Sequence, residues 1–525
     1  MSWWVAGADR QWKDNAVSAA APVWSVDPRT GKPREEVAVE ATPQEVDQAV
    51  RAAHATRGAL VGLSARAVFL RTAADLLDAS AEHVVEAADA ETALGPVRLK
   101  GELARTTAQL RAFAEAVEDG SFLDIRIDHA DASRTPPWPD LRRVKIPLGV
   151  AAVYSASNFP LAFSVPGGDT ASALAAGCPV VVKAHPDHPA TSELCVSLLR
   201  RAAVQAGLPE DVVVLVHGFT AGVELVRHPL VSAAGFTGSV RGGRALFDAA
   251  AARPVPIPFH GELGSLNPVV VTAAAAMERG EQIGAGLGTS MTMGVGQFCT
   301  KPGLVLAPQG AAGDTLLKAL TAAVSDTDAG VMLDHRMRDA FVAGVAERAA
   351  LPGVEAPVTP GAGGEHTVSG GFLTVPAALL ATEGEHDLLL EECFGPVTVV
   401  ARYADESEIG AVLSRLPGNL TATLQLSSAE AAGEGSGAQL LAQLTELAGR
   451  VLVDGWPTGV AVAPAQHHGG PYPATTSTST SVGATAVERW LRPVTYQSTP
   501  QALLPPELRD DNPLGLPRRV NGTLG

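Results

Sequence analysis

Cys299 follows a glycine-rich stretch, Gly294-Val-Gly-Gln-Phe-Cys-Thr300. Glycine lets the backbone approach another group closely, so a thiol placed just after it can lie in a cleft and act, as a thiolate, as a nucleophile. A buried cysteine that packs as a small apolar side chain is the alternative. The other three cysteines, Cys178, Cys195 and Cys393, are predicted to be structural. With no CxxC pair, the sequence indicates a reducing, cytoplasmic location rather than a disulfide framework.

Glu262 and Asn158 are the candidate polar partners of such a nucleophile. Glu262 lies between glycines, directly before an apolar segment. Its carboxylate can act as a base if burial desolvates it, or it can cap the amides of a turn. Asn158 follows a predicted strand, within Ser157-Asn-Phe-Pro160. Its side-chain amide can donate to an oxyanion or stabilise a turn.

Two further segments suit a phosphorylated cofactor. Lys183 ends a predicted strand, from where its ammonium can reach a ribose or a ribose phosphate. Phe236-Thr-Gly-Ser239 follows another predicted strand and opens a helix, whose N-terminus attracts phosphate. A simple turn between strand and helix is the alternative, because the full GxGxxG fingerprint is missing.

No metal site is predicted from the histidines. Prolines interrupt the segment that holds His185 and His188, which excludes a metal-binding pair on one helix. The adjacent pair His467 and His468 is predicted to lie in a solvated loop.

The composition excludes several classes of protein. Hydrophobic residues make up 46% and charged residues 18% of the 525 residues, which indicates a large core rather than disorder. With 39 basic and 56 acidic residues the net charge is −17, which argues against nucleic acid or an anionic membrane as partner. No apolar run is long enough to span a bilayer, and the first residues do not read as a signal peptide.

The candidate residues must be positioned by secondary-structure elements. From about residue 149 onward, strands and helices are predicted to alternate. Short apolar strands are predicted at 150–154, 179–183, 212–216, 233–236 and 268–272, with helices between them, and the alternation restarts less regularly after residue 272. This pattern predicts parallel, doubly wound sheets, which bind ligands at the carboxyl ends of their strands. Helices are expected over 42–118 and an extended ribbon over 119–148. Residues 430–438 are expected to form a surface loop, 473–486 to be flexible and the proline-rich tail from Thr499 to be loosely held.

The order and spacing of six motifs together resemble the aldehyde dehydrogenase superfamily. The motifs are SNFP, VVKAHP, FTGS, ELG, GQFC and EECFGP, and the resemblance covers about residues 20 to 500. The segments GGDTASALAAGCPVVVKAHP, VDGWPTGV and HHGGPYPATTSTSTSVG are most similar to one branch. That branch contains α-ketoglutarate semialdehyde (2,5-dioxopentanoate) dehydrogenase and an NADP-dependent fatty aldehyde dehydrogenase.

The resemblance implies a role for eight residues. Catalytic roles fall on Cys299 as nucleophile, Glu262 as general base and Asn158 as oxyanion donor. Cofactor contacts fall on Lys183 at the adenosine ribose, Gly238 and Ser239 near the pyrophosphate, and Glu392 and Phe394 around the nicotinamide and its ribose.

The resemblance also implies an architecture of two doubly wound, Rossmann-like α/β domains with a small oligomerisation ribbon. The implied parts are a cofactor domain (1–118 and 149–261), a catalytic domain (262–486), a β-ribbon (119–148 and 487–500) and a tail (501–525). A homo-oligomer, either a dimer or a tetramer, is implied by the ribbon.

The implied activity is the NAD(P)-dependent oxidation of an aldehyde to an acid through a thiohemiacetal and a thioester on Cys299. The expected substrate is α-ketoglutarate semialdehyde, with 2-oxoglutarate as product. Alternatives are a long-chain or another semialdehyde, transfer of the acyl group to CoA, a cysteine-dependent thioester or ester hydrolase, and a non-catalytic protein on the same fold. NADP is the expected cofactor with NAD as second, because no acidic residue follows Lys183 until Asp187. The family's usual pattern changes at Ser157, which alters the substrate channel, and at Lys301 and Pro302. Pro186 stands where the NADP-dependent fatty aldehyde enzyme is expected to have a hydroxyl residue.

Overall fold

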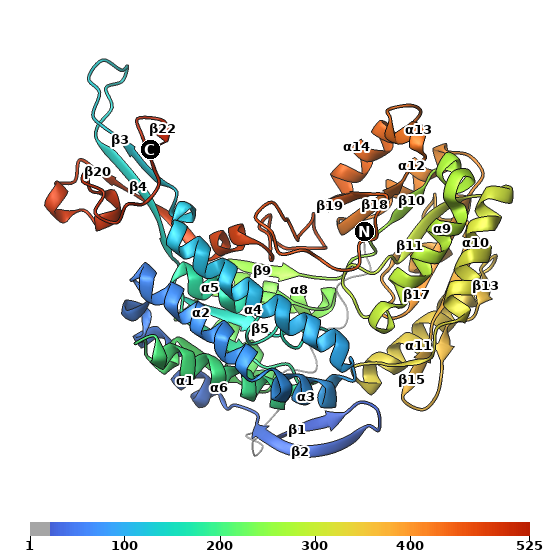
Figure 1. Ribbon diagram of the computed structural model, residues 1–525, viewed down its shortest axis with the longest axis horizontal. Helices are drawn as coiled ribbons and strands as arrows, with labels where there is room; N and C mark the ends of the chain where they lie inside the picture. The colour runs from blue at the N-terminus through green and yellow to red at the C-terminus, as the bar shows by residue number, and fades with distance from the viewer. Residues whose placement is uncertain (1–20, 525) are drawn as a thin grey trace.

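Two sheets covered by helices make up most of the molecule, and a third, smaller sheet projects from one side (Figure 1). The computed structural model describes residues 21–524. The first twenty residues of the predicted cofactor domain and the last residue of the predicted tail lie outside this range. The predicted fold class, two doubly wound α/β units with an added β element, is confirmed.

The first sheet has five parallel strands in the order β7-β6-β5-β8-β9. Along β5, alternate side chains point to opposite faces, so Val150 and Ala152 pack on one helical layer while Ala151 and Val153 pack on the other. Helices α1, α7 and α8 cover one face and α2 to α6 the other. The chain runs outward from β5 to β7 and then returns to β8, so the strand order reverses between β5 and β8. A ligand is expected at such a reversal, outside the carboxyl ends of the strands.

The elements of this part have the following bounds: β5 Val150–Tyr154, β6 Val180–Lys183, β7 Val213–Val216, β8 Val231–Thr237, β9 Phe259–Glu262, α1 Pro43–Ala55, α2 Leu63–Ala79, α3 Ala81–Thr92, α4 Pro96–Asp119, α5 Gly168–Ala176, α6 Pro189–Gln205, α7 Phe219–Arg227 and α8 Val240–Ala251. A hairpin of β1 (Pro22–Asp27) and β2 (Lys32–Val39) precedes them.

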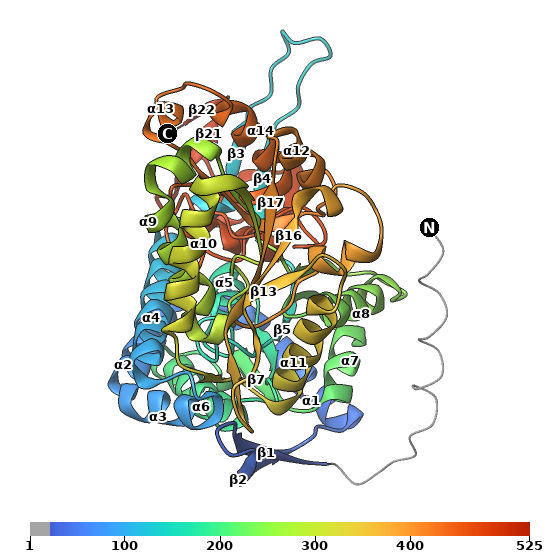
Figure 2. The ribbon, with the colours of Figure 1, turned by 90° about the vertical axis from the view of Figure 1, so that its right-hand side faces the viewer.

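The second sheet has seven strands in the order β13-β16-β17-β11-β10-β18-β19, all parallel except β13 at one edge. Helices α9 and α10 pack on one face and α12 and α14 on the other (Figure 2). Its elements are β10 Val269–Val271, β11 Leu304–Pro308, β13 Glu355–Val358, β16 Gly371–Pro376, β17 Val397–Tyr403, β18 Asn419–Gln425, β19 Ala448–Val453, α9 Ala273–Thr292, α10 Gly310–Ser325, α11 His335–Ala349, α12 Ser407–Leu413, α13 Ser428–Ala431 and α14 Gly437–Leu447. The loop predicted at 430–438 is therefore shorter, because both of its ends belong to helices.

The third sheet joins segments from distant parts of the chain, in the order β20-β4-β3-β21-β22. Its strands are β3 Ile125–Asp128, β4 Leu141–Pro147, β20 Leu491–Gln497, β21 Arg518–Val520 and β22 Thr523–Leu524. The extended character predicted for 119–148 agrees with β3 and β4. The prediction of a loosely held tail is wrong, because β21 pairs in parallel with β3 and Leu508 and Leu516 are buried in the main core. None of the helices within residues 21–524 is long and apolar enough to cross a membrane.

Candidate active site

Cys299 lies at the end of a tight loop that follows α9 and a short 3-10 helix, Met293–Gly296. Gly294, Val295 and Gly296 all have positive φ. A Cβ at Gly296 would lie 2.3 Å from the carbonyl carbon of Gly395, so only glycine allows this close contact. The loop thereby packs against the segment of the EECFGP motif and leaves Cys299 partly exposed.

Asn267 and Lys301 tie the loop that carries Cys299 to the neighbouring segments through hydrogen bonds. The side-chain amide of Asn267 donates to the carbonyl oxygens of Cys299, at 2.8 Å, and of Lys301, at 3.0 Å. The buried Lys301 ammonium donates to the carbonyl oxygens of Cys393 and Val397, at 3.2 and 2.6 Å. The Cys299 backbone is therefore tied to both neighbouring motifs. The sequence indicated no such role for Asn267, which stands at a positive φ of 53° before β10.

Glu262, Cys299 and His468 bring their functional atoms within 4.8 Å of one another. Glu262 is the last residue of β9, and its side chain is 2% exposed. One carboxylate oxygen accepts from His468 Nε2 at 2.9 Å, and the other accepts from Ser481 Oγ at 2.7 Å. The Cys299 Sγ lies 3.8 Å from the same His468 nitrogen. Since a carboxylate can only accept, His468 Nε2 carries the proton in this arrangement.

The segment around residues 467–486 differs from the prediction. His468 is buried instead of lying in a solvated loop, and the Ser/Thr-rich segment packs across Glu262 instead of staying loose. The backbone of Thr475 forms an isolated antiparallel β-bridge with that of Glu262, and the Ser481 hydroxyl donates to the Glu262 carboxylate. The sequence signal that could have found this was the low charge of the segment, because Ser and Thr hydroxyls suit a buried carboxylate.

The surroundings lower the pKa of Glu262 and raise that of the Cys299 thiol. Burial would raise the pKa of Glu262, but His468, Ser481 and the Cys299 thiol outweigh it and lower that pKa to about 2. Burial raises the pKa of the Cys299 thiol well above its usual value and the Glu262 carboxylate adds to this, while Arg105 opposes it. At neutral pH the resting pair is an ionised carboxylate beside a protonated thiol, so Glu262 is placed to accept a proton from sulfur or from water.

The same three side chains are chemically suited to chelate a divalent metal ion, since imidazole, thiolate and carboxylate are the usual zinc ligands. The sequence prediction of no metal site treated His468 as solvated and did not consider this grouping.

Asn158 lies just past β5 and faces the cysteine loop. Its Nδ2 donates to the carbonyl oxygen of Gln297 at 3.0 Å, which leaves the second hydrogen of the amide free to donate elsewhere. The backbone carbonyl oxygen of Asn158 accepts a hydrogen bond from Arg98 Nη2 at 2.6 Å. The Arg98 guanidinium also lies over the rings of Phe159 and Phe298. These contacts fix Asn158 next to the residues that precede Cys299.

Helix α4 contributes a charged face that the sequence analysis did not single out. Arg98, Glu102 and Arg105 are spaced by four and three residues and so share one side of the helix. Glu102 accepts from the backbone amides of Leu161 and Ala162, at 2.8 and 2.9 Å. This face thus holds the segment that follows Asn158.

Lys183, Gly238 and Ser239 lie at the carboxyl ends of β6 and β8, where the doubly wound sheet binds ligands. Ser239 caps α8 by accepting from Gly242 N at 3.2 Å, and Gly238 N donates to the carbonyl oxygen of Glu262 at 3.0 Å. Within residues 21–524 the Lys183 ammonium has no hydrogen bond or ion pair, and burial lowers its pKa to about 8. A partly buried ammonium without a partner, beside a helix N-terminus, fits an anionic dinucleotide.

Glu392 and Phe394 come from the loop that contacts the cysteine segment. A Cβ at Gly264 would lie 2.5 Å from the Glu392 carboxylate, so Gly264 permits this carboxylate to approach β9. Burial raises the pKa of Glu392 to about 7, although Lys301 opposes that shift. Phe394 packs partly against an apolar cluster that includes Phe341 and Val397.

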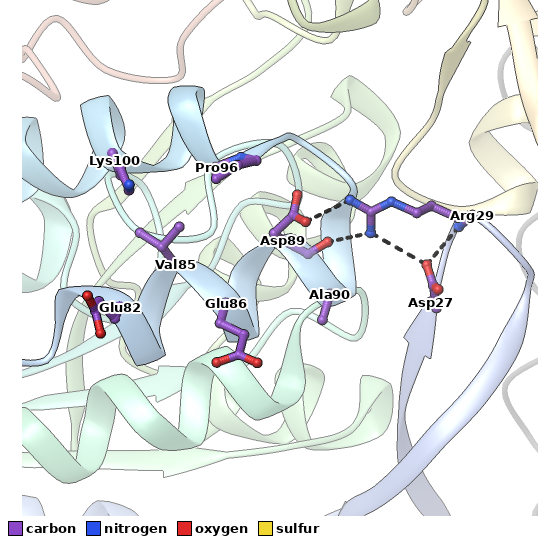
Figure 3. A pocket seen from close by; sticks show the side chains of 9 residues that line it. All are labelled: Asp27, Arg29, Glu82, Val85, Glu86, Asp89, Ala90, Pro96 and Lys100. Atoms are coloured by element: carbon purple, nitrogen blue, oxygen red, sulfur yellow. Dashed lines mark hydrogen bonds and ion pairs between the residues drawn. The ribbon is translucent and has the colours of Figure 1, made fainter.

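A surface hollow of about 480 Å³ lies well away from these residues, between the first hairpin and helices α3 and α4 (Figure 3). Its main cation, Arg29, is already paired with Asp27 and Asp89. None of the eight predicted site residues lines it.

The sequence profile of the aldehyde dehydrogenase family matches residues 16–435 of the chain. The chain belongs to this family. As an aldehyde dehydrogenase it oxidises aldehydes with NAD or NADP, so the predicted activity, enzyme class and aldehyde substrate are confirmed, as is the family resemblance.

Two relatives of this aldehyde dehydrogenase are similar over most of its length. Alpha-ketoglutaric semialdehyde dehydrogenase 2 of Azospirillum brasilense is 48% identical over 465 residues, covering 88% of this chain and 87% of that protein. Alpha-ketoglutaric semialdehyde dehydrogenase of Acinetobacter baylyi is 42% identical over 525 residues, with 97% of both chains covered. Among solved structures, methylmalonate-semialdehyde dehydrogenase of Oceanimonas doudoroffii matches with a TM-score of 0.77 at 20% identity, covering 93% of this chain and 97% of that one.

Proposed function

We propose that this aldehyde dehydrogenase oxidises α-ketoglutaric semialdehyde to 2-oxoglutarate, with NADP as preferred cofactor and NAD as second. The substrate rests on the two relatives with 48% and 42% identity, both of which carry that activity in their names. The chemistry rests on one observation, the contact between Glu262, Cys299 and His468 at the carboxyl end of β9.

Cys299 is the nucleophile of the proposed reaction. The Glu262 carboxylate accepts the thiol proton, and the thiolate sulfur forms a bond to the aldehyde carbon. The carbonyl π electrons move to the oxygen, giving a thiohemiacetal anion. The free hydrogen of the Asn158 amide, with the Cys299 backbone N–H, stabilises this anion; one oxyanion-hole donor contributes about 3 kcal/mol in hydrolases that form a similar anion.

Glu262 also serves the second half of the reaction. A nicotinamide cofactor, which Glu392 and Phe394 would hold, would supply a two-electron acceptor for the hydride of the thiohemiacetal carbon, and loss of that hydride would leave a thioester on Cys299. Glu262 first releases the thiol proton to solvent. A water molecule then loses a proton to the ionised Glu262 and its oxygen attacks the thioester carbon; the carbon–sulfur bond breaks, the acid leaves, and Glu262 returns the proton to sulfur. His468 and Ser481 hold the carboxylate in place and keep it ionised between these steps.

The surroundings of Lys183 support NADP as the preferred cofactor. Lys183 is a free ammonium at the end of β6, and no acidic residue follows it before Asp187, so no immediately adjacent carboxylate repels a 2′-phosphate. Burial raises the pKa of Asp187 well above its usual value, and its carboxyl lies 3.5 Å from Arg336. Both effects reduce the repulsion that the Asp187 carboxyl would exert on a 2′-phosphate. We assign Gly238 and Ser239 to the pyrophosphate, and Glu392 and Phe394 to the nicotinamide end.

The test is a set of steady-state measurements with the purified protein. The kcat/KM values for α-ketoglutaric semialdehyde, succinic semialdehyde and a long-chain aldehyde are compared, each with NAD and with NADP. The proposal expects the first substrate to exceed the others by about tenfold or more, with NADP ahead of NAD. A preference for the long-chain aldehyde, or an acyl-CoA product when CoA is added, would contradict it.

A further inference from the structure

Arg105 is a cation near the candidate nucleophile that has no hydrogen-bond or ion-pair partner among the described residues. Within residues 21–524 its guanidinium makes no hydrogen bond and no ion pair, and its Nε is buried. The neighbouring carboxylate Glu102 is not within ion-pair distance and is occupied by the amides of Leu161 and Ala162. Leaving a partly buried guanidinium with a buried Nε and no hydrogen-bond acceptor is unfavourable, which points to a ligand that supplies the acceptor.

The position of Arg105 relates it directly to the reacting groups. The guanidinium lies over the ring of Phe163, 5.1 Å from its centre. That ring in turn lies 6.2 Å from the ring of His468, which contacts both Glu262 and Cys299. Arg105 is also close enough to favour ionisation of both Cys299 and Glu262, against their burial.

Two other arginines near the site differ from Arg105 because each already donates to at least one backbone carbonyl oxygen, although Nη1 of Arg98 and Nε of Arg450 have no hydrogen-bond partner within residues 21–524. Arg98 donates to the Asn158 carbonyl and packs between Phe159 and Phe298. Arg450, on β19, donates to the carbonyl oxygens of Gly459 and Pro457. Both are held in place by these bonds, so among these three arginines Arg105 is the one whose guanidinium has no hydrogen-bond partner within residues 21–524.

We propose that Arg105 is a carboxylate-binding subsite for the far end of a short ω-oxo acid whose aldehyde reacts at Cys299. The planar guanidinium fork matches a carboxylate in two parallel hydrogen bonds. In a five-carbon oxo acid the terminal carbons are about 5 Å apart when extended, from C–C bonds of about 1.5 Å. Such a molecule is long enough to leave the aldehyde at sulfur and bring the carboxylate toward α4.

Arg105 would also offset the negative charge of the carboxyl groups around the site. Glu262 and Glu392 are carboxyl groups close to Cys299, and Glu102 binds the segment that follows Asn158. An anionic substrate would be repelled by them unless a cation offsets the repulsion. Arg105 supplies that cation on the side of the first sheet. The inference rests on the proposed function, since it names the group by which the substrate is selected.

The test compares Arg105→Met with the parent on two aldehydes of equal length, glutaric semialdehyde and pentanal. Loss of the charge-assisted contact should lower kcat/KM for glutaric semialdehyde by about 10- to 100-fold, mainly through KM, and leave pentanal within about threefold. Arg105→Lys should restore part of the loss. Arg111→Met is the matched control on the same helix, since Arg111 pairs with Asp75 and Asp78 on the surface, and it should change neither substrate.

Equal losses on both aldehydes would show that Arg105 only supports the fold or the thiol, and an unchanged glutaric semialdehyde rate would show that no carboxylate binds there. Either result overturns the subsite. The proposed function fails in a different measurement, the parent's own preference among semialdehydes. A parent that prefers succinic semialdehyde but loses that activity in Arg105→Met would refute the proposed substrate and keep the subsite.

Discussion

A base that takes part in two proton transfers must be ionised each time it acts, and the surroundings of Glu262 meet this requirement. Its side chain is almost fully buried, which by itself favours the neutral acid. Two hydrogen-bond donors, His468 Nε2 and Ser481 Oγ, reverse that tendency. The balance keeps the pKa of Glu262 at about 2. The carboxylate is therefore ready at any ordinary assay pH, at the expense of being a weaker base than one with a pKa near 7.

Replacing Glu262 by Gln separates the two halves of the proposed reaction. The amide keeps the shape of the carboxylate but cannot take a proton from water. We expect a rapid burst of reduced cofactor, followed by steady turnover lowered about 100-fold or more, because release of the thioester becomes limiting. Stopped-flow absorbance of the reduced cofactor measures both phases. Cys299→Ala should show no burst, and parental turnover in Glu262→Gln would remove the base assignment.

Replacing His468 by Gln should make the reaction sensitive to acid. Glutamine can still donate to Glu262 but carries no charge, so burial then dominates and raises the pKa of the carboxyl. A raised pKa means that activity is lost as pH falls through the new value. The acid limb of the kcat profile should therefore move upward by about one pH unit or more. His467→Gln, one residue earlier and partly exposed, is the control, and superimposable profiles for His468→Gln and the parent would contradict the argument.

At the scale of elements, the sequence revealed the strands better than the segments that cross between them. Buried parallel strands are continuous apolar runs, so the five predicted strands correspond to β5, β6, β7, β8 and β10 with errors of one or two residues at their ends, whereas β9 was not predicted. The Ser/Thr-rich segment before residue 486 and the tail gave no such signal. Their order depends on hydrogen bonds and pairing with distant residues, such as Ser481 with Glu262 and β21 with β3.

The site was only partly predictable for the same reason. Motif order brought out Cys299, Glu262 and Asn158, which the structure places around one loop. His468 and Arg105 were missed because each looks ordinary in its own segment. A histidine pair in a polar stretch is usually solvated, and an arginine on an amphipathic helix usually faces water. The packing of α4 and of residues 467–486 near the loop that carries Cys299 is what places Arg105 and His468 at the site.

Replacing Asn267 tests whether the loop that carries Cys299 depends on its hydrogen bonds to the segment before β10. Asn267 is buried at a positive φ and bonds the carbonyls of Cys299 and Lys301, and its Oδ1 accepts from Ser265 and Thr421. Asn267→Ala should lower the free energy of unfolding by about 2–4 kcal/mol, since several buried groups lose their partner. It should also lower kcat by about tenfold, because Cys299 is no longer fixed.

Thermal unfolding and steady-state rates measure the two effects of Asn267→Ala. The matched control is Asn521→Ala in the third sheet, another asparagine with positive φ that bonds distant residues. It should lower stability and leave kcat unchanged. A parental kcat in folded Asn267→Ala would show that the cysteine loop does not depend on this tie.

At the scale of the whole molecule, the third sheet is the part most exposed to a second copy of the chain. It projects from the body on the side away from the second sheet (Figure 1). Its outer strand β20 pairs with β4 on one side, and within residues 21–524 no strand pairs with its other side. The exposed residues of this strand are Arg492, Pro493, Thr495 and Gln497. An exposed edge strand of seven residues is a template for pairing unless it is covered.

We therefore expect a homo-oligomer in solution, with β20 at the contact between copies. Light scattering at micromolar concentration should give about 108 or 216 kDa, two or four times the 53.9 kDa of the chain. Thr495→Lys should weaken this association about tenfold or more, because a charged lysine on an edge strand opposes pairing with another strand. Pairing with β4 should survive, since the facing Arg143 is already neutralised by Asp124. A parent of 53.9 kDa would exclude the assembly, and an unchanged mass for Thr495→Lys would move the contact away from β20.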